Sequence, residues 1–235
     1  MISVEWKYLN TKSIRNNEVV RSEVLACVIL EKYLYNNEIL VVGTDPSKKL
    51  PDIHNKNKTI GFEVVRCESE IDYEIEDFAK KLCEIEWDYN AYIELKKHNT
   101  NHIFNKSKLQ YFKDGTIKKN RVQFHKNDWL NKLFSERLDN KLLKLNKGNY
   151  GACNEISLVM LSTYRMIDDN FADFISRLYK KECERFRIHF KDIYLITNKN
   201  IYTITKNGIS KLSENIYQFD LCVKEMKRIL DIDSS

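Results

Sequence analysis

The sequence predicts an α/β fold in which a mixed β-sheet is flanked by helices. Two observations predict it. Short apolar blocks, typical of buried strands, alternate along the chain with longer segments in which apolar residues recur every three or four positions, typical of helices. No internal repeat and no linker-like stretch interrupts this order. Residues 1–235 are therefore interpreted as a single domain.

Composition places the chain among soluble globular proteins, with 43% hydrophobic and 31% charged residues. No apolar run approaches the roughly 18 residues that a membrane span needs, and the first residues lack the basic-then-apolar layout of a secretion signal. The six cysteines occur singly, without a Cys-x-x-Cys pair, which argues against a zinc ribbon. We expect reduced, buried thiols in a cytoplasmic protein without membrane contact.

The first part of the chain is expected to hold a helix, three strands and a second helix. Residues 19–35 have a wide apolar face, and residues 71–93 carry a continuous apolar stripe at helical spacing. The expected elements are a short edge strand around Val4, Trp6 and Tyr8, a helix at 19–35, a strand at 39–42 ended by a turn at 43–46, two apolar runs at 50–54 and 60–67 joined by a polar turn at 55–59, and a long helix at 72–97.

The remaining elements begin with an irregular, basic region at 99–126, in which Asp114-Gly115 predicts a β-hairpin. Gly148 is expected to end the next helix, and Asp168 or Asp169 to begin the one after it. In order, the expected elements are a helix at 127–146, a buried strand at 156–161, a helix at 169–185, a hairpin of strands 193–197 and 201–205, and a closing helix at 214–230.

An acidic residue in the second apolar run is unusual. Glu63 lies among Ile60, Phe62 and Val64, and a carboxylate in such a strand is costly unless it is paired or binds a metal. If the two runs are neighbouring antiparallel strands, Asp52 in the first run lies beside Glu63. Two carboxylates placed in this way would hold Mg²⁺ through oxygen ligands.

Pro51-Asp52 followed by Glu63-Val64-Val65 resembles the PD-(D/E)xK nuclease superfamily, the restriction-endonuclease-like fold. The resemblance implies a core of helix, three strands, helix and strand, with 99–126 as a basic hairpin insertion and a C-terminal hairpin plus helix added. It also implies a Mg²⁺- or Mn²⁺-dependent nuclease that acts on phosphodiester bonds of DNA or RNA, with Asp52 and Glu63 as metal ligands. Many enzymes of that fold act as dimers, so a homodimer is a further expectation.

The sequence departs from that superfamily at one position. The superfamily has a lysine two residues after the second acid, where this chain has Val65, and Arg66 points to the other face of the strand. Lys141 and Lys132, on the helix at 127–146, are the candidate replacements. Lys141 is next to the apolar stripe and could reach inward past Leu138, and lysines on this helix are a known variation in the superfamily.

Glu23 is a candidate third acid, because it shares a helix face with apolar residues and the resemblance includes a helix glutamate before the first strand. The alternative is a favourable charge near the positive end of a helix. Glu31 is a second possibility that looks more like a surface residue, and His54 is more simply a structural contact. The candidate catalytic residues are Asp52, Glu63, Lys141 and Glu23.

Charge is distributed unevenly along the chain. Residues 68–88 hold nine acids against two lysines, and residues 106–126 hold seven basic residues against one acid. This asymmetry suggests a face directed at a polyanion, although solvated surfaces explain it equally well. Basic residues interleaved with aromatics could bind a nucleic-acid backbone, or the hairpin aromatics could simply pack on the domain. The candidate nucleic-acid-binding residues are Lys108, Lys113, Lys118, Lys119 and Arg121.

Three classes of function remain open. The first is a metal-dependent phosphodiesterase. The second is a catalytically degenerate nuclease fold that binds nucleic acid, which Val65 favours because its side chain cannot donate to a phosphate. The third is a structural protein in which Glu63 is paired with Arg66 or Lys141. Motifs of other hydrolases, such as Gly-x-Ser-x-Gly, the Walker loop or His-Glu-x-x-His, do not occur.

Overall fold

The computed structural model describes residues 3–4, 18–43, 50–68, 109–111, 117–119, 128–148, 150, 153–162, 167–212 and 216–230. The chain divides into two compact units, one formed by residues 1–67 and 134–235 and the other by residues 68–133. The first unit carries a mixed sheet, and the second carries a two-stranded sheet. The interpretation of residues 1–235 as one domain with an insertion at 99–126 stays a prediction.

The sheet of the first unit has eight strands within the described residues, in the order β1-β2-β3-β4-β7-β8-β9-β10. The central strands β4, β7 and β8 run parallel to one another, β1 runs parallel to β2, and the other neighbours are antiparallel. The predicted mixed sheet is confirmed. The strands are β1 Ser3–Val4, β2 Leu40–Val42, β3 Ile53–Asn55, β4 Ile60–Arg66, β7 Glu155–Leu161, β8 Ile193–Ile196, β9 Ile201–Ile204 and β10 Ile209–Leu212.

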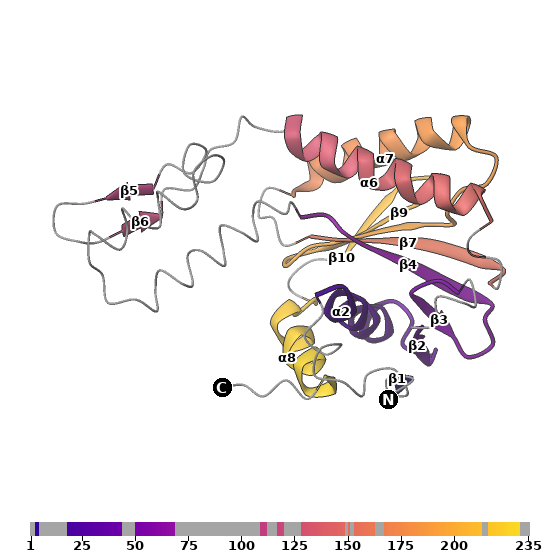
Figure 1. The fold of residues 1–235 in the computed structure, drawn as a ribbon, viewed down its shortest axis with the longest axis horizontal. Helices are drawn as coiled ribbons and strands as arrows, with labels where there is room; N and C mark the ends of the chain where they lie inside the picture. Colours follow the sequence, from indigo (N-terminus) through magenta and orange to yellow (C-terminus); the bar gives the residue numbers. More distant parts are fainter. Residues whose placement is uncertain are drawn as a thin grey trace, which may run out of the picture. The chain divides into compact units, whose positions relative to one another are not determined.

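Helices cover both faces of this sheet (Figure 1). Helix α2 (Glu18–Tyr33) and helix α8 (Phe219–Ile229) lie on one face, and helix α7 (Asp169–Arg185) lies on the other with residues 134–146 of helix α6 (Asp128–Asn146). This two-sided cover explains why β4 and β8 are buried along nearly their whole length and do not alternate between buried and exposed residues. No described helix is long and apolar enough to cross a membrane.

The side chains of β4 alternate between the two layers of helices. Phe62 and Val64 belong to the core that α2 and α8 share with the sheet. Val65 instead lines a hollow with residues of α6. Because side chains two apart on a strand share a face, Glu63 lies on the α6 side with Val65.

Several expected helix ends are confirmed. Asp168 caps α7, and its Oδ1 accepts a hydrogen bond from the backbone N–H of Phe171 at 3.0 Å. Gly148 follows α6 with φ +71°, and its N–H donates to the carbonyl of Leu145 at 3.1 Å. A left-handed glycine in this position satisfies a free carbonyl of the last turn.

The C-terminal part differs from the prediction in two ways. Helix α8 begins at Phe219 and not at Glu214, because Tyr217 is buried outside the helix and its hydroxyl donates to the carbonyl of Thr197 at 3.0 Å. Strand β10 was not predicted. Its four residues alternate weakly and are no more than half-buried at the edge of the sheet, so its hydrophobic pattern is too short to recognise.

In the second unit, β5 (Leu109–Tyr111) pairs antiparallel with β6 (Ile117–Lys119), which confirms the predicted hairpin pairing. Other expectations lie outside the described residues. These are the edge-strand residues Trp6 and Tyr8, the turn beyond Gly43, the helix at 72–97 and the hairpin turn at Asp114-Gly115.

The turn between β3 and β4 is held by the side chain of Asn55. Its Oδ1 accepts hydrogen bonds from the N–H groups of Thr59 at 2.9 Å and Ile60 at 3.2 Å, and its amide donates to the Thr59 hydroxyl at 2.8 Å. Lys58 takes a positive φ of 54° within the turn. These bonds help fix the register in which Ile53 faces Phe62.

Gly61 in β4 allows a close approach that any other residue would prevent. A Cβ atom on Gly61 would lie 2.5 Å from Cγ of Pro51 and 3.0 Å from Sγ of Cys153. We expect Gly61→Ala to lower the free energy of unfolding by about 1–3 kcal/mol, the usual cost of overpacking. Urea denaturation measures this, with Ser210→Ala at an exposed strand position as the control. An unchanged midpoint for Gly61→Ala would contradict the close packing of Pro51 on β4.

Candidate functional site

Asp52 and Glu63 are brought together by the pairing of β3 with β4. The two strands are antiparallel and neighbouring, as the sequence analysis required, and Ile53 faces Phe62. The next step of this register places Asp52 opposite Glu63. The Oδ2 atom of Asp52 accepts a hydrogen bond of 2.7 Å from the backbone N–H of Val64. This bond fixes the Asp52 carboxylate against β4.

Lys141 reaches Glu63 from α6. Its ammonium forms an ion pair with Oε1 of Glu63 and donates a hydrogen bond of 3.0 Å to the carbonyl of Val64. Leu138 and Leu142 on the same helix are fully buried and set its orientation. The lysine therefore supplies a cation on the face of β4 where Val65 supplies none. Lys132, the other candidate, is exposed in the 68–133 unit.

Glu23 on α2 lies within the electrostatic field of these groups. Burial raises the pKa of Glu23 to about 8, the charges of Asp52 and then Glu63 add to the rise, and Lys141 opposes it. Glu23 is in the second turn of a helix that begins at Glu18. The positive end of a helix acts mainly within the first turn and would lower the pKa, so the helix-dipole explanation of Glu23 does not account for its environment.

The pKa of Asp52 is also raised. Burial raises the pKa of Asp52 to about 6, and the negative charge of Glu63 contributes further. Lys141 and the hydrogen bond from Val64 oppose the rise. The structure thus brings Asp52, Glu63 and Lys141 together through strand pairing and direct contacts, and Glu23 is near enough for their charges to act on its pKa. We call this group the carboxylate cluster.

Because the pKa of Glu23 is about 8, Glu23 is largely protonated near neutral pH, and the carboxylate cluster then holds the carboxylates of Asp52 and Glu63 against the one ammonium of Lys141. Glu63 is 4% exposed, and its Oε2 is the one buried side-chain polar atom in the described part of the chain that forms no hydrogen bond of standard length and angle, although the side chains of Asp52 and Tyr150 are close enough for Glu63 to raise their pKa values. An unpartnered buried acceptor usually costs about 1–3 kcal/mol, and more when it is charged. A cation beside Oε2 would remove this cost and balance the excess charge.

The oxygen atoms of the carboxylate cluster fit a divalent ion only in an open site. Within the described ranges, no three His, Cys, Asp or Glu side chains are arranged to hold a metal ion together. Mg²⁺, however, is usually bound by one or two carboxylates and keeps several waters. Asp52 and the free oxygen of Glu63 fit a site of this open kind, and they do not fit an all-protein cage.

Tyr150 is a neighbour of the cluster that the sequence analysis missed. It is buried, and burial raises the pKa of its hydroxyl above the usual range, with the charge of Glu63, a side-chain hydrogen bond with Glu63 and the charge of Asp52 adding to the effect. It lies two residues beyond Gly148, in the connection that follows the helix carrying Lys141. An isolated tyrosine in a loop forms no recognisable pattern, so no signal in the sequence could have found it.

His54 and the five candidate nucleic-acid-binding residues do not join the cluster in the described structure. His54 is buried in β3, where its Nδ1 lies 2.9 Å from the carbonyl of Asn55, a structural contact as expected. Lys118 and Lys119 are in β6, of which only the backbone is described. Lys108, Lys113 and Arg121 lie outside the described residues, so a nucleic-acid role for the hairpin stays a prediction.

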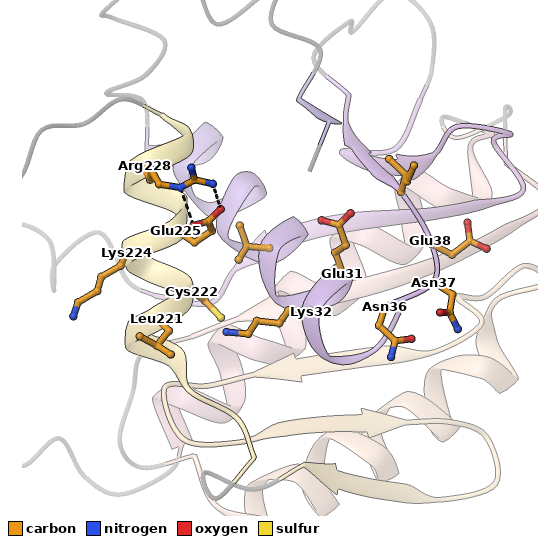
Figure 2. A pocket seen from close by; sticks show the side chains of 12 residues that line it. Glu31, Lys32, Asn36, Asn37, Glu38, Leu221, Cys222, Lys224, Glu225 and Arg228 are labelled. Carbon is orange, nitrogen blue, oxygen red and sulfur yellow. Dashed lines mark hydrogen bonds and ion pairs between the residues drawn. The ribbon is translucent and has the colours of Figure 1, made fainter. Parts of the chain in front are cut away.

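A larger hollow of about 740 Å³ lies between α2, α8 and the segment that follows α2 (Figure 2). Its lining includes Glu31, the alternative acid on α2, but none of the four residues of the carboxylate cluster. Its charges are of both signs, and Arg228 is already paired with Glu225 through hydrogen bonds of 3.0 and 2.6 Å. The hollow therefore offers no focused charge for a ligand.

The cysteines do not form a second reactive site in the described structure. The five described cysteines are free thiols, and Cys83 lies outside the described residues. Burial raises the pKa of Cys27, Cys153, Cys183 and Cys222, which keeps these thiols protonated and weakly nucleophilic.

Comparison of the chain with protein-family models, with curated proteins and with solved structures found no match.

Proposed function

We propose that the protein is a Mg²⁺- or Mn²⁺-dependent nuclease that hydrolyses phosphodiester bonds of DNA or RNA at the carboxylate cluster. The observation that carries the proposal is the meeting of Asp52, Glu63 and Lys141, with one oxygen of Glu63 left without a partner in a cluster that has too few positive charges. Asp52 directly precedes β3, Glu63 lies in β4 and Lys141 lies in α6.

The protein groups have distinct roles in this proposal. A bound Mg²⁺ would supply Lewis-acid stabilisation of the charge that develops on the phosphate oxygens. Asp52, oriented by the N–H of Val64, and the free oxygen of Glu63 would hold the ion. Lys141 would offset negative charge on the scissile phosphate, because its ammonium is held at the edge of the cluster by Glu63 and the Val64 carbonyl.

The order of the elements supports a likeness to the PD-(D/E)xK superfamily. Helix α2 is followed by β2, β3 and β4, and the later helix α6 leads into β7, which pairs parallel with β4. This order is compatible with the helix, three strands, helix and strand that the resemblance implies. In this proposal Lys141 replaces the strand lysine whose place Val65 occupies.

One observation favours a second candidate, a nuclease-like fold without catalysis. The ion pair between Lys141 and Glu63 is also what a purely structural role for Glu63 predicts. Removing one member of a buried pair is costly whether or not the pair has another function. The two candidates differ in what they expect of the free oxygen of Glu63, which only the metal-binding proposal uses.

Thermal unfolding with and without Mg²⁺ separates the two candidates. A ligand that binds only the folded protein, at a concentration a hundred times its Kd, adds about 2.7 kcal/mol to the free energy of unfolding. We expect such a rise in wild type and its loss in Glu63→Gln, with NaCl of equal ionic strength as the control. Equal responses of wild type and Glu63→Gln to Mg²⁺ would remove the metal site.

The same experiment has an expected pH dependence. Asp52 and Glu23 have folded-state pKa values of about 6 and about 8, above their ordinary values of 3.8 and 4.5. The stability they contribute is complete below pH of about 4 and is lost as the pH rises through these values. Without metal, we expect their part of the stability to fall between about pH 4 and 8. Stabilisation by Mg²⁺ should grow over that window, because the ligands must be ionised to bind it.

A further inference from the structure

A groove on α6 lies beside the carboxylate cluster. It has a volume of about 350 Å³ and is built by residues of the unit formed by 1–67 and 134–235. We call it the α6 groove, and its lining residues are Val65, Arg137, Asn140, Lys141, Leu143, Lys144 and Lys147. Four of these seven residues are basic and none is acidic, so the groove has a single sign of charge.

The basic residues form one stripe along the helix. Arg137, Lys141 and Lys144 are spaced by four and three residues, which places them on one face, and Lys147 continues the stripe just beyond the helix end. At 1.5 Å per residue the stripe is about 15 Å long. Measured along the axis of B-form DNA, this length corresponds to a rise of about four base pairs, at 3.4 Å for each phosphate of one strand.

Within the ranges that the structure describes, three of these cations have no partner. Among the described residues, the side chains of Arg137, Lys144 and Lys147 form neither an ion pair nor a hydrogen bond. Elsewhere on the surface, Arg185, Lys191 and Lys211 are each paired with a carboxylate. The cations of the α6 groove are therefore available to an anionic partner.

Lys141 joins the groove to the carboxylate cluster. Its side chain lines the groove while its ammonium contacts Glu63 and the carbonyl of Val64. Val65 forms part of the groove wall two residues after Glu63 on the same face of β4. An anion seated near Lys141 would thus lie next to the acids of the cluster.

We propose that the α6 groove binds the phosphodiester backbone of a nucleic-acid strand and leads it to the carboxylate cluster. That the strand is led to the carboxylate cluster rests on the proposed nuclease function. The proposal assigns the binding surface to α6 and not only to the hairpin at 99–126. The groove lining contains no aromatic residue on which a base could stack. Binding is therefore through phosphates and independent of sequence.

The test compares a groove variant with a matched surface variant. Arg137→Gln, Lys144→Gln and Lys147→Gln are combined in one protein, and Lys199→Gln, Lys224→Gln and Lys227→Gln, three exposed lysines outside the α6 groove, in another. Binding is measured by fluorescence anisotropy in EDTA, with duplex DNA, single-stranded DNA and single-stranded RNA of matched length as probes, over a range of salt concentrations. Circular dichroism checks that both variants are folded.

We expect the groove variant to bind at least about tenfold more weakly than wild type. The slope of log K against log salt should become shallower by roughly two to three, because each lost phosphate contact removes about 0.7–0.9 from it. The surface variant should change by less than about twofold, since its lysines are not aligned toward one strand. Probes of different sequence should bind wild type alike.

Three outcomes overturn the proposal. They are wild-type affinity in the groove variant, an equal loss in the surface variant, or no binding of wild type to any of the three probes. Because EDTA removes divalent ions, the result does not depend on catalysis. If Mg²⁺ fails to stabilise the protein while the groove variant still loses affinity, the nuclease proposal is wrong, and the α6 groove remains the nucleic-acid-binding surface.

Discussion

Asp52→Asn and Glu63→Gln are each expected to abolish divalent-dependent cleavage of nucleic acid while leaving the protein folded. Both substitutions keep the size of the side chain and remove its charge. The amide oxygen introduced by Asp52→Asn can still accept the hydrogen bond that the N–H of Val64 donates to Asp52, so the position of the side chain is maintained. Losing one positioned electrostatic contribution to a transition state costs about 100- to 1,000-fold in rate.

Cleavage is measured with labelled duplex DNA and single-stranded RNA in the presence of Mg²⁺ or Mn²⁺. The matched control is Glu155→Gln, which removes an exposed acid from the neighbouring strand β7 and breaks only its pair with Lys191. The control should cleave as wild type does. If both cluster variants are as active as the control, the catalytic site lies elsewhere in the protein.

Lys141→Met is expected to cause the largest loss of stability of any single substitution at the cluster. It removes the cation from Oε1 of Glu63, whose Oε2 already has no partner, and leaves a buried carboxylate without compensation. Breaking a buried pair in this way typically costs about 3–5 kcal/mol. We expect a decrease of this size in the free energy of unfolding, measured by urea denaturation without divalent ions at neutral pH.

A double variant shows whether the loss comes from the charge of Glu63. Lys141→Met combined with Glu63→Gln leaves a neutral amide in place of the carboxylate, so most of the lost stability should return. The matched control is Lys191→Met, which breaks an ion pair whose members are 53% and 48% exposed. That loss should stay within about 1 kcal/mol. A double variant no more stable than Lys141→Met would show that packing, and not the unpaired charge, accounts for the effect.

The two predictions differ in what they require of the protein. The cleavage prediction depends on a bound divalent ion and on a substrate. The stability prediction depends only on the burial of Glu63 and its contact with Lys141. If stability falls as expected and cleavage is absent in wild type, the cluster is a structural element of a degenerate nuclease-like fold, which is the second candidate function.

Most of the described secondary structure could be predicted from local patterns. The spacing of apolar residues indicated α2, α6 and α7 to within about two residues, because one face of each helix packs on the sheet. The ends of α6 and α7 followed from Gly148 and Asp168, whose roles depend only on adjacent backbone groups. The start of α8 was wrong because a tertiary contact, from Tyr217 to Thr197, keeps the chain out of the helix.

The positions of Asp52 and Glu63 could also be predicted, because a charged residue in an apolar strand is a local anomaly with a physical cost. Glu23 and Lys141 could be proposed only as residues on the appropriate helices. Whether either side chain reaches the strand depends on how α2 and α6 pack, and Lys141 is 78 residues from Glu63 in the chain. Tyr150 carried no local pattern and could not have been found from the sequence.

By itself, the sequence determined the mixed α/β architecture, the order of its elements and the two acids that stand out within it. Only the tertiary structure decided which cation reaches Glu63, which of its oxygens stays without a partner and that the basic stripe of α6 lines a groove beside it. The physical reason is that the spacing of apolar residues, and the presence of a charged residue among them, can be recognised within one or two turns of chain. Pairing of distant charges depends on the packing of whole elements, which no local pattern records.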